Sequence, residues 1–83
     1  MKTMTCRQLA GACDEKFRAE TFEEIGELSR AHAVKMAGLG DAAHIAKMDE
    51  MRNLMNDPEA ARRAFDGLRE VFDALPEDGA PAT

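Results

Sequence analysis

The sequence is poor in cysteine, histidine and large aromatic residues. Its 83 residues include two cysteines and two histidines, four phenylalanines, and neither tryptophan nor tyrosine. No apolar run approaches the roughly 20 residues that a helix needs to span a bilayer. The opening residues, Met-Lys-Thr-Met-Thr-Cys-Arg, lack the apolar segment of a signal peptide. We therefore expect no membrane partner and a cytoplasmic location, where thiols stay reduced.

Sequence patterns of enzymes and of nucleic-acid-binding proteins are also missing. We find no Ser-His-Asp arrangement, phosphate-binding glycine loop or dinucleotide fingerprint, and we expect the protein not to be an enzyme. Residues 1–40 carry six basic and six acidic side chains, whereas residues 41–83 carry five and ten, which accounts for the net charge of −5. Because the acidic half would repel phosphate backbones, nucleic acid is not an expected partner.

The apolar residues suffice for one small folded domain. They make up 45% of the chain, which argues against a disordered protein. A chain of this length buries only about 63% of its unfolded surface, so a metal, a disulfide or a partner chain would add needed stability. We expect a single domain over residues 1–76, made of a ββα unit (1–40) and a helical hairpin (41–76), with a disordered tail at 77–83.

Two short antiparallel strands are predicted at the N-terminus. Met1–Leu9 reads as the first strand and Lys16–Ala19 as the second, because polar and apolar side chains alternate in both. Two strands alone would be marginal in water, so a helix must cover them. The residues expected to point inward are Met4, Cys6, Phe17 and Ala19.

Three helices are predicted to follow, each with a recognisable start. Thr21 begins a capping box with Glu24, and the run Gly38-Leu39-Gly40 ends that first helix. Asp41 can cap a second helix that extends to about residue 56. Asp57 can cap a third helix with Pro58 at its first position, and this helix stops before residue 76. The fold class is therefore α+β, in the order β-β-α-α-α.

Apolar residues recur at helical spacing in all three helices. The last two helices are expected to pack antiparallel, either against the first helix or in a dimer. The expected inward positions of the first helix are Phe22, Ile25, Leu28, Ser29, His32 and Met36, and those of the second are Ile45, Met48, Met51, Leu54 and Met55. The third contributes Ala61, Ala64, Phe65, Leu68, Val71, Phe72 and Leu75.

Cys6, Cys13 and His32 could converge in a ββα unit. Thiolate and imidazole are preferred ligands of zinc and of softer ions such as Cu(I). The candidates for a fourth ligand are Asp14, Met36 and His44; Met36 would favour Cu(I), and the other two would favour zinc. Two other interpretations remain open, namely that the cysteines are small buried apolar residues or that they form a disulfide or redox pair. Their six-residue separation is not the C-x-x-C redox motif.

A family resemblance favours the metal site. The segment Met-Lys-Thr-Met-Thr-Cys-Arg-Gln-Leu-Ala-Gly-Ala-Cys-Asp, then Arg-Ala-Glu-Thr at 18–21 and His-Ala at 32–33, resembles a family of small bacterial and archaeal proteins. That family is described as a domain of unknown function and as predicted small metal-binding proteins. The resemblance implies that Cys6, Cys13 and His32 are ligands. Ala37 stands where many members have a second histidine, so another residue would have to replace it.

From these observations we expect a small cytoplasmic protein that binds a metal ion, zinc first and Cu(I) second, in a structural or carrier role. The alternative is a metal-free helical interaction module. It would act through protein–protein contact or homodimerisation by way of the helices in residues 41–76.

Overall fold

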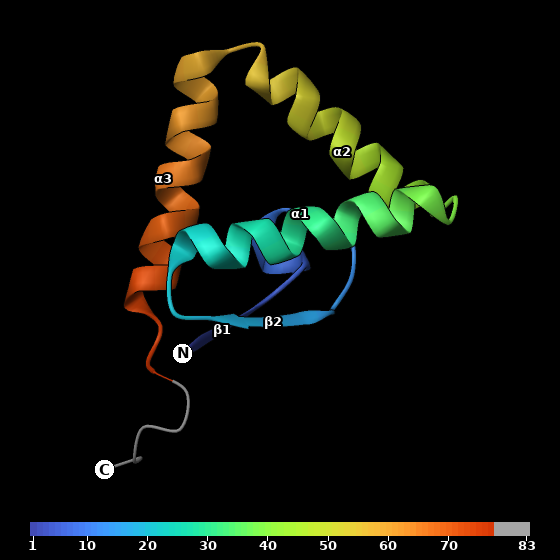
Figure 1. The fold of residues 1–83 in the computed structure, drawn as a ribbon. Helices are drawn as coiled ribbons and strands as arrows, with labels where there is room; N and C mark the ends of the chain where they lie inside the picture. Colours follow the sequence, from blue (N-terminus) through green and yellow to red (C-terminus); the bar gives the residue numbers. More distant parts are fainter. Residues whose placement is uncertain (78–83) are drawn as a thin grey trace.

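The computed structural model describes residues 1–77, which form two antiparallel strands followed by three helices (Figure 1). This order confirms the predicted α+β fold. The tail was predicted at residues 77–83, of which 78–83 lie outside the described residues. The carboxylate of Glu77 accepts a hydrogen bond from the amino group of Met1 at 2.6 Å. The elements are β1 (Lys2–Thr5), a short 3-10 helix η1 (Arg7–Leu9), β2 (Lys16–Ala19), α1 (Phe22–Gly38), α2 (Ala42–Met55) and α3 (Pro58–Ala74).

The two strands form a hairpin that presents one apolar face to the helices. Met4 pairs with Phe17 in the antiparallel register, and Lys2 pairs with Ala19. The predicted inward residues of both strands are buried, and they form the core together with Leu9, Ile25 of α1 and Phe72 of α3. The alternation of side chains therefore predicted the inner face of the hairpin correctly.

The first strand is shorter than predicted, because the chain turns at Cys6. Cys6 has helical backbone angles (φ −51°, ψ −45°), and its carbonyl accepts hydrogen bonds from the N–H groups of Leu9 and Gly11. The segment 7–9 is thus a 3-10 helix instead of extended strand. This turn places the Cys6 side chain at the end of the hairpin, inside the core.

All three predicted N-caps are present. The side-chain oxygens of Thr21, Asp41 and Asp57 accept from the backbone N–H three residues further on, at 3.0–3.2 Å. Each cap satisfies one of the amides that have no partner within the helix. Within residues 1–77, no helix combines the length and apolar character that a membrane span requires.

The connection between α1 and α2 is a Schellman motif. Gly40 has a positive φ of 81°, its N–H donates to the carbonyl of Ala37, and the N–H of Asp41 donates to the carbonyl of Met36. Glycine adopts this conformation without strain because it has no β-carbon. Because Asp41 also caps α2, the chain reverses within three residues and brings the start of α2 back toward α1.

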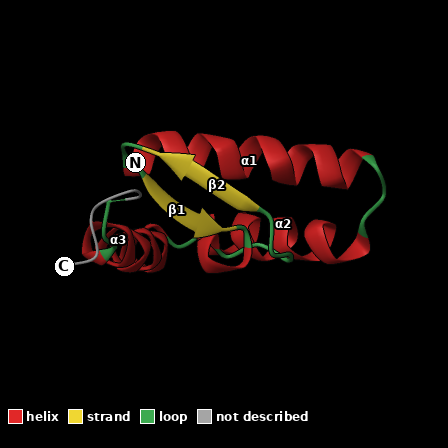
Figure 2. Ribbon diagram, turned by 90° about the horizontal axis from the view of Figure 1, so that it is seen from below, coloured by secondary structure: helices red, strands yellow, loops and turns green. Residues whose placement is uncertain are grey.

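Both later helices pack on α1 within the same chain. The rings of Phe22 in α1 and Phe72 in α3 meet edge to face at 6.0 Å, and Arg69 of α3 pairs with Glu23 of α1 at 2.8 Å. The hairpin lies across α1 (Figure 2). α2 and α3 splay apart from the turn that joins them and form a V over α1 (Figure 1).

Some residues predicted to point inward are exposed. Leu28 is 44% exposed, Ile45 39% and Met55 55%. A two-stranded hairpin is too narrow to cover the whole apolar stripe of α1, and the divergence of α2 from α3 leaves part of each stripe uncovered. The periodicity therefore identified the helices correctly but overestimated how much of each face is buried.

Candidate metal centre

The loop between the strands holds the two cysteines close together. Beyond the last strand pair, the N–H of Cys6 donates to the carbonyl of Glu15 at 2.7 Å, and the N–H of Arg7 donates to the carbonyl of Cys13 at 2.8 Å. These hydrogen bonds continue the antiparallel pairing past the hairpin. As a result, two cysteines separated by six residues in the sequence face each other across the loop.

Gly11 makes room for the Cys6 side chain. A β-carbon at this position would overlap the sulfur of Cys6 and would lie 2.8 Å from its carbonyl oxygen. The preceding residue, Ala10, has a left-handed backbone with φ 68°, which is uncommon for a residue with a β-carbon. The loop is therefore tightly wound around the Cys6 sulfur.

α1 brings His32 to the second cysteine. His32 Nε2 lies 3.2 Å from the Sγ of Cys13. Its ring packs edge to face on Phe17 of β2, with the ring centres 5.4 Å apart. His32 is three turns into α1, so the direction of this helix across the hairpin sets its position.

α2 brings His44 to the first cysteine. His44 Nε2 lies 3.7 Å from the Sγ of Cys6, and the residue is only 3% exposed. Its Nδ1 lies 3.0 Å from an Asp41 carboxylate oxygen, the same oxygen that caps α2. A carboxylate oxygen only accepts hydrogen bonds, so Nδ1 carries a proton, and in the neutral ring the lone pair of Nε2 is directed at the cysteines.

The four side chains form a compact Cys2His2 cluster. The sulfur atoms of Cys6 and Cys13 and one ring nitrogen each of His32 and His44 all lie within 4.8 Å of one another. Zinc–sulfur bonds of about 2.3 Å and zinc–nitrogen bonds of about 2.0–2.1 Å imply ligand separations of about 3.3–3.8 Å in a tetrahedron. The observed sulfur–nitrogen distances of 3.2 and 3.7 Å fit that size.

The two thiols differ in how readily they ionise, which matters because a metal binds the thiolate form. Burial alone would raise the pKa of Cys6, but backbone hydrogen bonds from Cys13 and Ala12 and a hydrogen bond with His44 outweigh it, and the pKa lies below the usual value. A backbone hydrogen bond from Glu15 acts to lower the pKa of Cys13, yet burial and the neighbouring Cys6 raise it overall. The Cys6 thiolate thus disfavours ionisation of Cys13, and a cation bound between the two sulfurs would remove that repulsion.

The structure separates the sequence-derived candidates for the fourth ligand. His44 joins the cluster, whereas Asp14 has a side chain that is 82% exposed and pairs with Arg7 at 3.5 Å. Met36 lies one turn beyond His32 on α1, and its part in the site stays a prediction. Both cysteines are free thiols, so the structure contains no Cys6–Cys13 disulfide.

The sequence reasoning missed two residues that support the cluster. Asp41 was predicted only as a cap, although it also bonds His44, and the role of Gly11 beside Cys6 was not predicted. The spacing Asp-x-x-His at a helix start could have indicated the first, because residues three apart lie on one face of a helix.

The comparisons with known proteins provide no family for this chain. No model of a known family matches it, and neither the curated proteins nor the solved structures include a significant match. The resemblance to predicted metal-binding proteins therefore stays a prediction, and the candidate site rests on the geometry described above.

Proposed function

We propose that this protein binds one metal ion, zinc first, through Cys6, Cys13, His32 and His44. The observation that supports the proposal most directly is that these four ligand atoms, drawn from the loop between the strands and from helices α1 and α2, lie within 4.8 Å of one another. Two thiolates and two neutral imidazoles suit zinc, and their charge would balance that of a divalent cation. Such balance favours binding at a site where Cys6 and His44 are buried. Cu(I) is the second candidate ion, since it shares the preference for thiolates.

The proposed role of the ion is structural. Four protein ligands complete a tetrahedron and leave no position for substrate or water, which is typical of structural zinc sites. The ion would join the cysteine loop to α1 and α2 in a protein with a small core. Binding would then add directly to the free energy of unfolding. We accordingly propose that the protein is not an enzyme. A carrier role is the alternative to a structural one, and the rate of metal exchange would distinguish the two.

Native mass spectrometry of protein purified without an affinity tag or chelator tests the proposal. We expect one bound ion in the parent and none in the Cys6→Ser/Cys13→Ser variant, and the mass difference identifies the metal. His44→Gln should weaken binding strongly, whereas Asp14→Asn, which alters an exposed residue paired with Arg7, should leave it unchanged. Failure of the reduced protein to bind offered zinc or Cu(I) would refute the proposal.

The second candidate function is a metal-free interaction module. Exposed apolar side chains on the last two helices, namely Ile45, Met55 and Val71, favour a protein partner or a second copy of the chain. A melting temperature that rises with protein concentration and is unaffected by chelator would support this alternative. A melting temperature that depends on chelator and not on concentration would support the metal site.

A further inference from the structure

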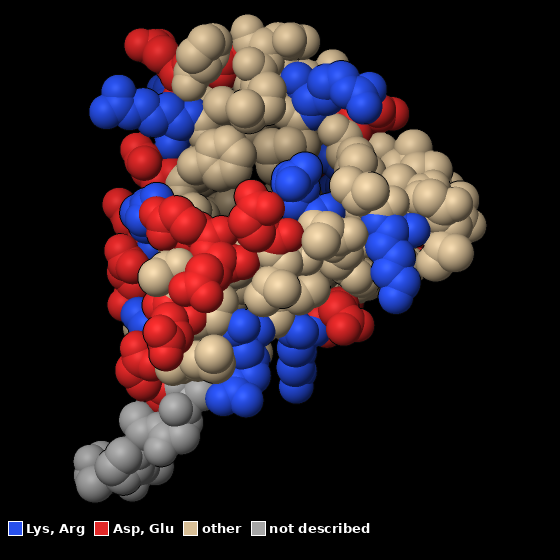
Figure 3. Space-filling view, in the orientation of Figure 1, with Lys and Arg blue, Asp and Glu red and all other residues tan. Residues whose placement is uncertain are grey.

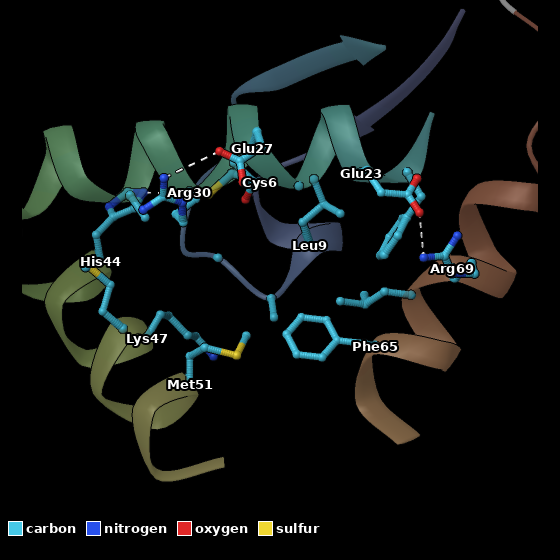
Figure 4. A pocket seen from close by; sticks show the side chains of 18 residues that line it. Cys6, Leu9, Glu23, Glu27, Arg30, His44, Lys47, Met51, Phe65 and Arg69 are labelled. Carbon is cyan, nitrogen blue, oxygen red and sulfur yellow. Dashed lines mark hydrogen bonds and ion pairs between the residues drawn. The ribbon is translucent and has the colours of Figure 1, made fainter. Parts of the chain in front are cut away.

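A cavity of about 510 Å³ lies between the diverging helices α2 and α3, beside the metal cluster. α1 and the 3-10 helix η1 form its base, and Figure 4 shows the side chains that point into it. This volume is in the range of about 300–1,000 Å³ typical of small-molecule sites. The large apolar side chains that line it are Leu9, Phe22, Met48, Met51, Phe65 and Leu68.

The charged groups of the cavity are unevenly placed. Figure 4 shows Arg30 and Lys47 at the end where His44 lies, and the Glu23–Arg69 pair at the opposite end, with Phe65 and Leu9 between them. The Glu23–Arg69 pair is closed at 2.8 Å, and its guanidinium also packs over the ring of Phe22 at 4.9 Å. This pair is therefore shorter, and its cation better held, than the ion pairs at the other end of the cavity.

The Arg30 and Lys47 end is different. Arg30 pairs with Glu27 at 3.4 Å and Lys47 with Glu50 at 3.4 Å; the Lys47 side chain is 46% exposed, and the other three are exposed by about 70%. Exposed pairs at this distance contribute little, so an incoming anion can compete for both cations. The cavity thus combines an apolar body with an end that holds two cations, each in a long ion pair with a glutamate, on a protein whose overall charge is −5.

We propose that this cavity binds a free, medium-chain monocarboxylate, with its carboxylate at Arg30 and Lys47 and its hydrocarbon chain along Met51, Phe65 and Leu9. The concave shape argues against the most symmetric alternative. A twofold dimer whose axis passed through this hollow would place one hollow against another and enclose an unfilled space, which is unfavourable. Figure 3 shows the hollowed, mainly uncharged surface between the upper parts of α2 and α3, with charged side chains around it.

Decanoate, used below its micelle-forming concentration, tests the proposal. Titration of the full 83-residue chain, followed by amide NMR shifts, should show saturable 1:1 binding with shifts at Leu9, Met51 and Phe65. Acetate, which has the head without the chain, should not bind. Decyltrimethylammonium, which has the same chain length with a cationic head, should bind at least about fivefold more weakly.

Two variants and a matched control locate the binding site. Lys47→Gln should weaken decanoate binding about two- to fivefold, as expected for a partly exposed ion pair. Phe65→Ala should weaken it about tenfold through loss of an aromatic wall, and Phe65 is exposed enough that the fold should persist. Lys35→Gln makes the same charge change on α1 outside the cavity and should have no effect.

Several results would overturn the proposal. In the titrations these are the absence of saturable decanoate binding, equal binding of the cationic amphiphile, and NMR shifts outside the cavity. Binding to anionic vesicles without binding to monomeric decanoate, or a dimer that covers Phe65, would overturn it as well. The titration is run on both zinc-loaded and metal-free protein, because the inference does not depend on the proposed metal. Loss of zinc binding with intact decanoate binding would refute only the metal site, and the reverse result would refute only the cavity proposal.

Discussion

Replacement of Asp41 by serine tests the metal centre through a residue that is not itself a ligand. One carboxylate oxygen of Asp41 accepts from the backbone N–H of His44 and from its ring Nδ1, both at 3.0 Å. Serine is also a good N-cap, so the helix start is retained while the ring loses its carboxylate partner. The variant therefore separates support of the histidine from support of the helix.

The expected effect is a loss of zinc affinity without loss of fold. Removal of a group that orients a metal-bound histidine weakens binding about 10- to 100-fold. A tenfold loss in affinity removes about 1.4 kcal/mol of metal-linked stability when zinc is in excess. For a domain of this size that loss corresponds to a decrease of about 6–11 °C in the melting temperature of the zinc-loaded protein.

Asp57→Ser is the matched control. Asp57 caps α3 through the N–H of Ala60 at 3.2 Å, and it has no histidine partner. Competition with a chromophoric chelator under reducing conditions gives the zinc affinity of each variant, and melting with and without chelator gives the stability. Equal zinc affinities for Asp41→Ser and Asp57→Ser would refute the argument that the Asp41 carboxylate orients His44.

The same pair predicts a pH dependence for the metal-free protein. The backbone N–H and then the ring of His44 lower the pKa of Asp41, so its contribution to stability is complete above about 3.8 and is lost at lower pH. Asp41 raises the pKa of His44, so that contribution is complete below about 6.5 and is lost as pH rises through the raised pKa. In the presence of chelator, the stability difference between parent and Asp41→Ser should be largest between these values. A difference that does not change with pH would contradict this assignment.

Three further predictions concern the loop, the metal and the core. Gly11→Ala should prevent zinc binding, because the new β-carbon would displace the Cys6 sulfur. Ala10→Gly should preserve zinc binding and relieve the left-handed backbone at residue 10. Equal zinc stoichiometry in the two variants would contradict this. As pH falls, protons compete with the metal for thiolates and imidazoles, so the rise in melting temperature on adding zinc should shrink, and a constant rise would argue against these ligands. Ile25→Ala should lower the free energy of unfolding by about 2–5 kcal/mol in chemical denaturation, because Ile25 is fully buried; a loss under 1 kcal/mol would show a less tightly packed core.

Local signals in the sequence predicted most of the fold. Thr21, Asp41 and Asp57 start their helices as expected, and Gly40 provides the turn after α1. Strand alternation identified Phe17 as a core residue. These features depend on groups a few residues apart, and a linear pattern is therefore sufficient to reveal them.

The boundary of the first strand and the fourth member of the cluster were harder to predict. The first strand was predicted too long because Cys6 bends the chain through hydrogen bonds that no strand pattern encodes. Asp14 is adjacent to Cys13 in sequence, yet its side chain is exposed and paired with Arg7. His44 is 38 residues from Cys6 and nevertheless contacts it.

The sequence by itself determined where each helix begins, which side of the hairpin is apolar, and that Cys6, Cys13 and His32 could meet. The tertiary structure alone decided that His44 lies with these three residues and that a cavity opens beside it. The physical reason is that both results depend on how α2 packs after the Gly40 turn. That packing is set by contacts among distant residues, including the ring contact of His32 with His44 at 5.1 Å.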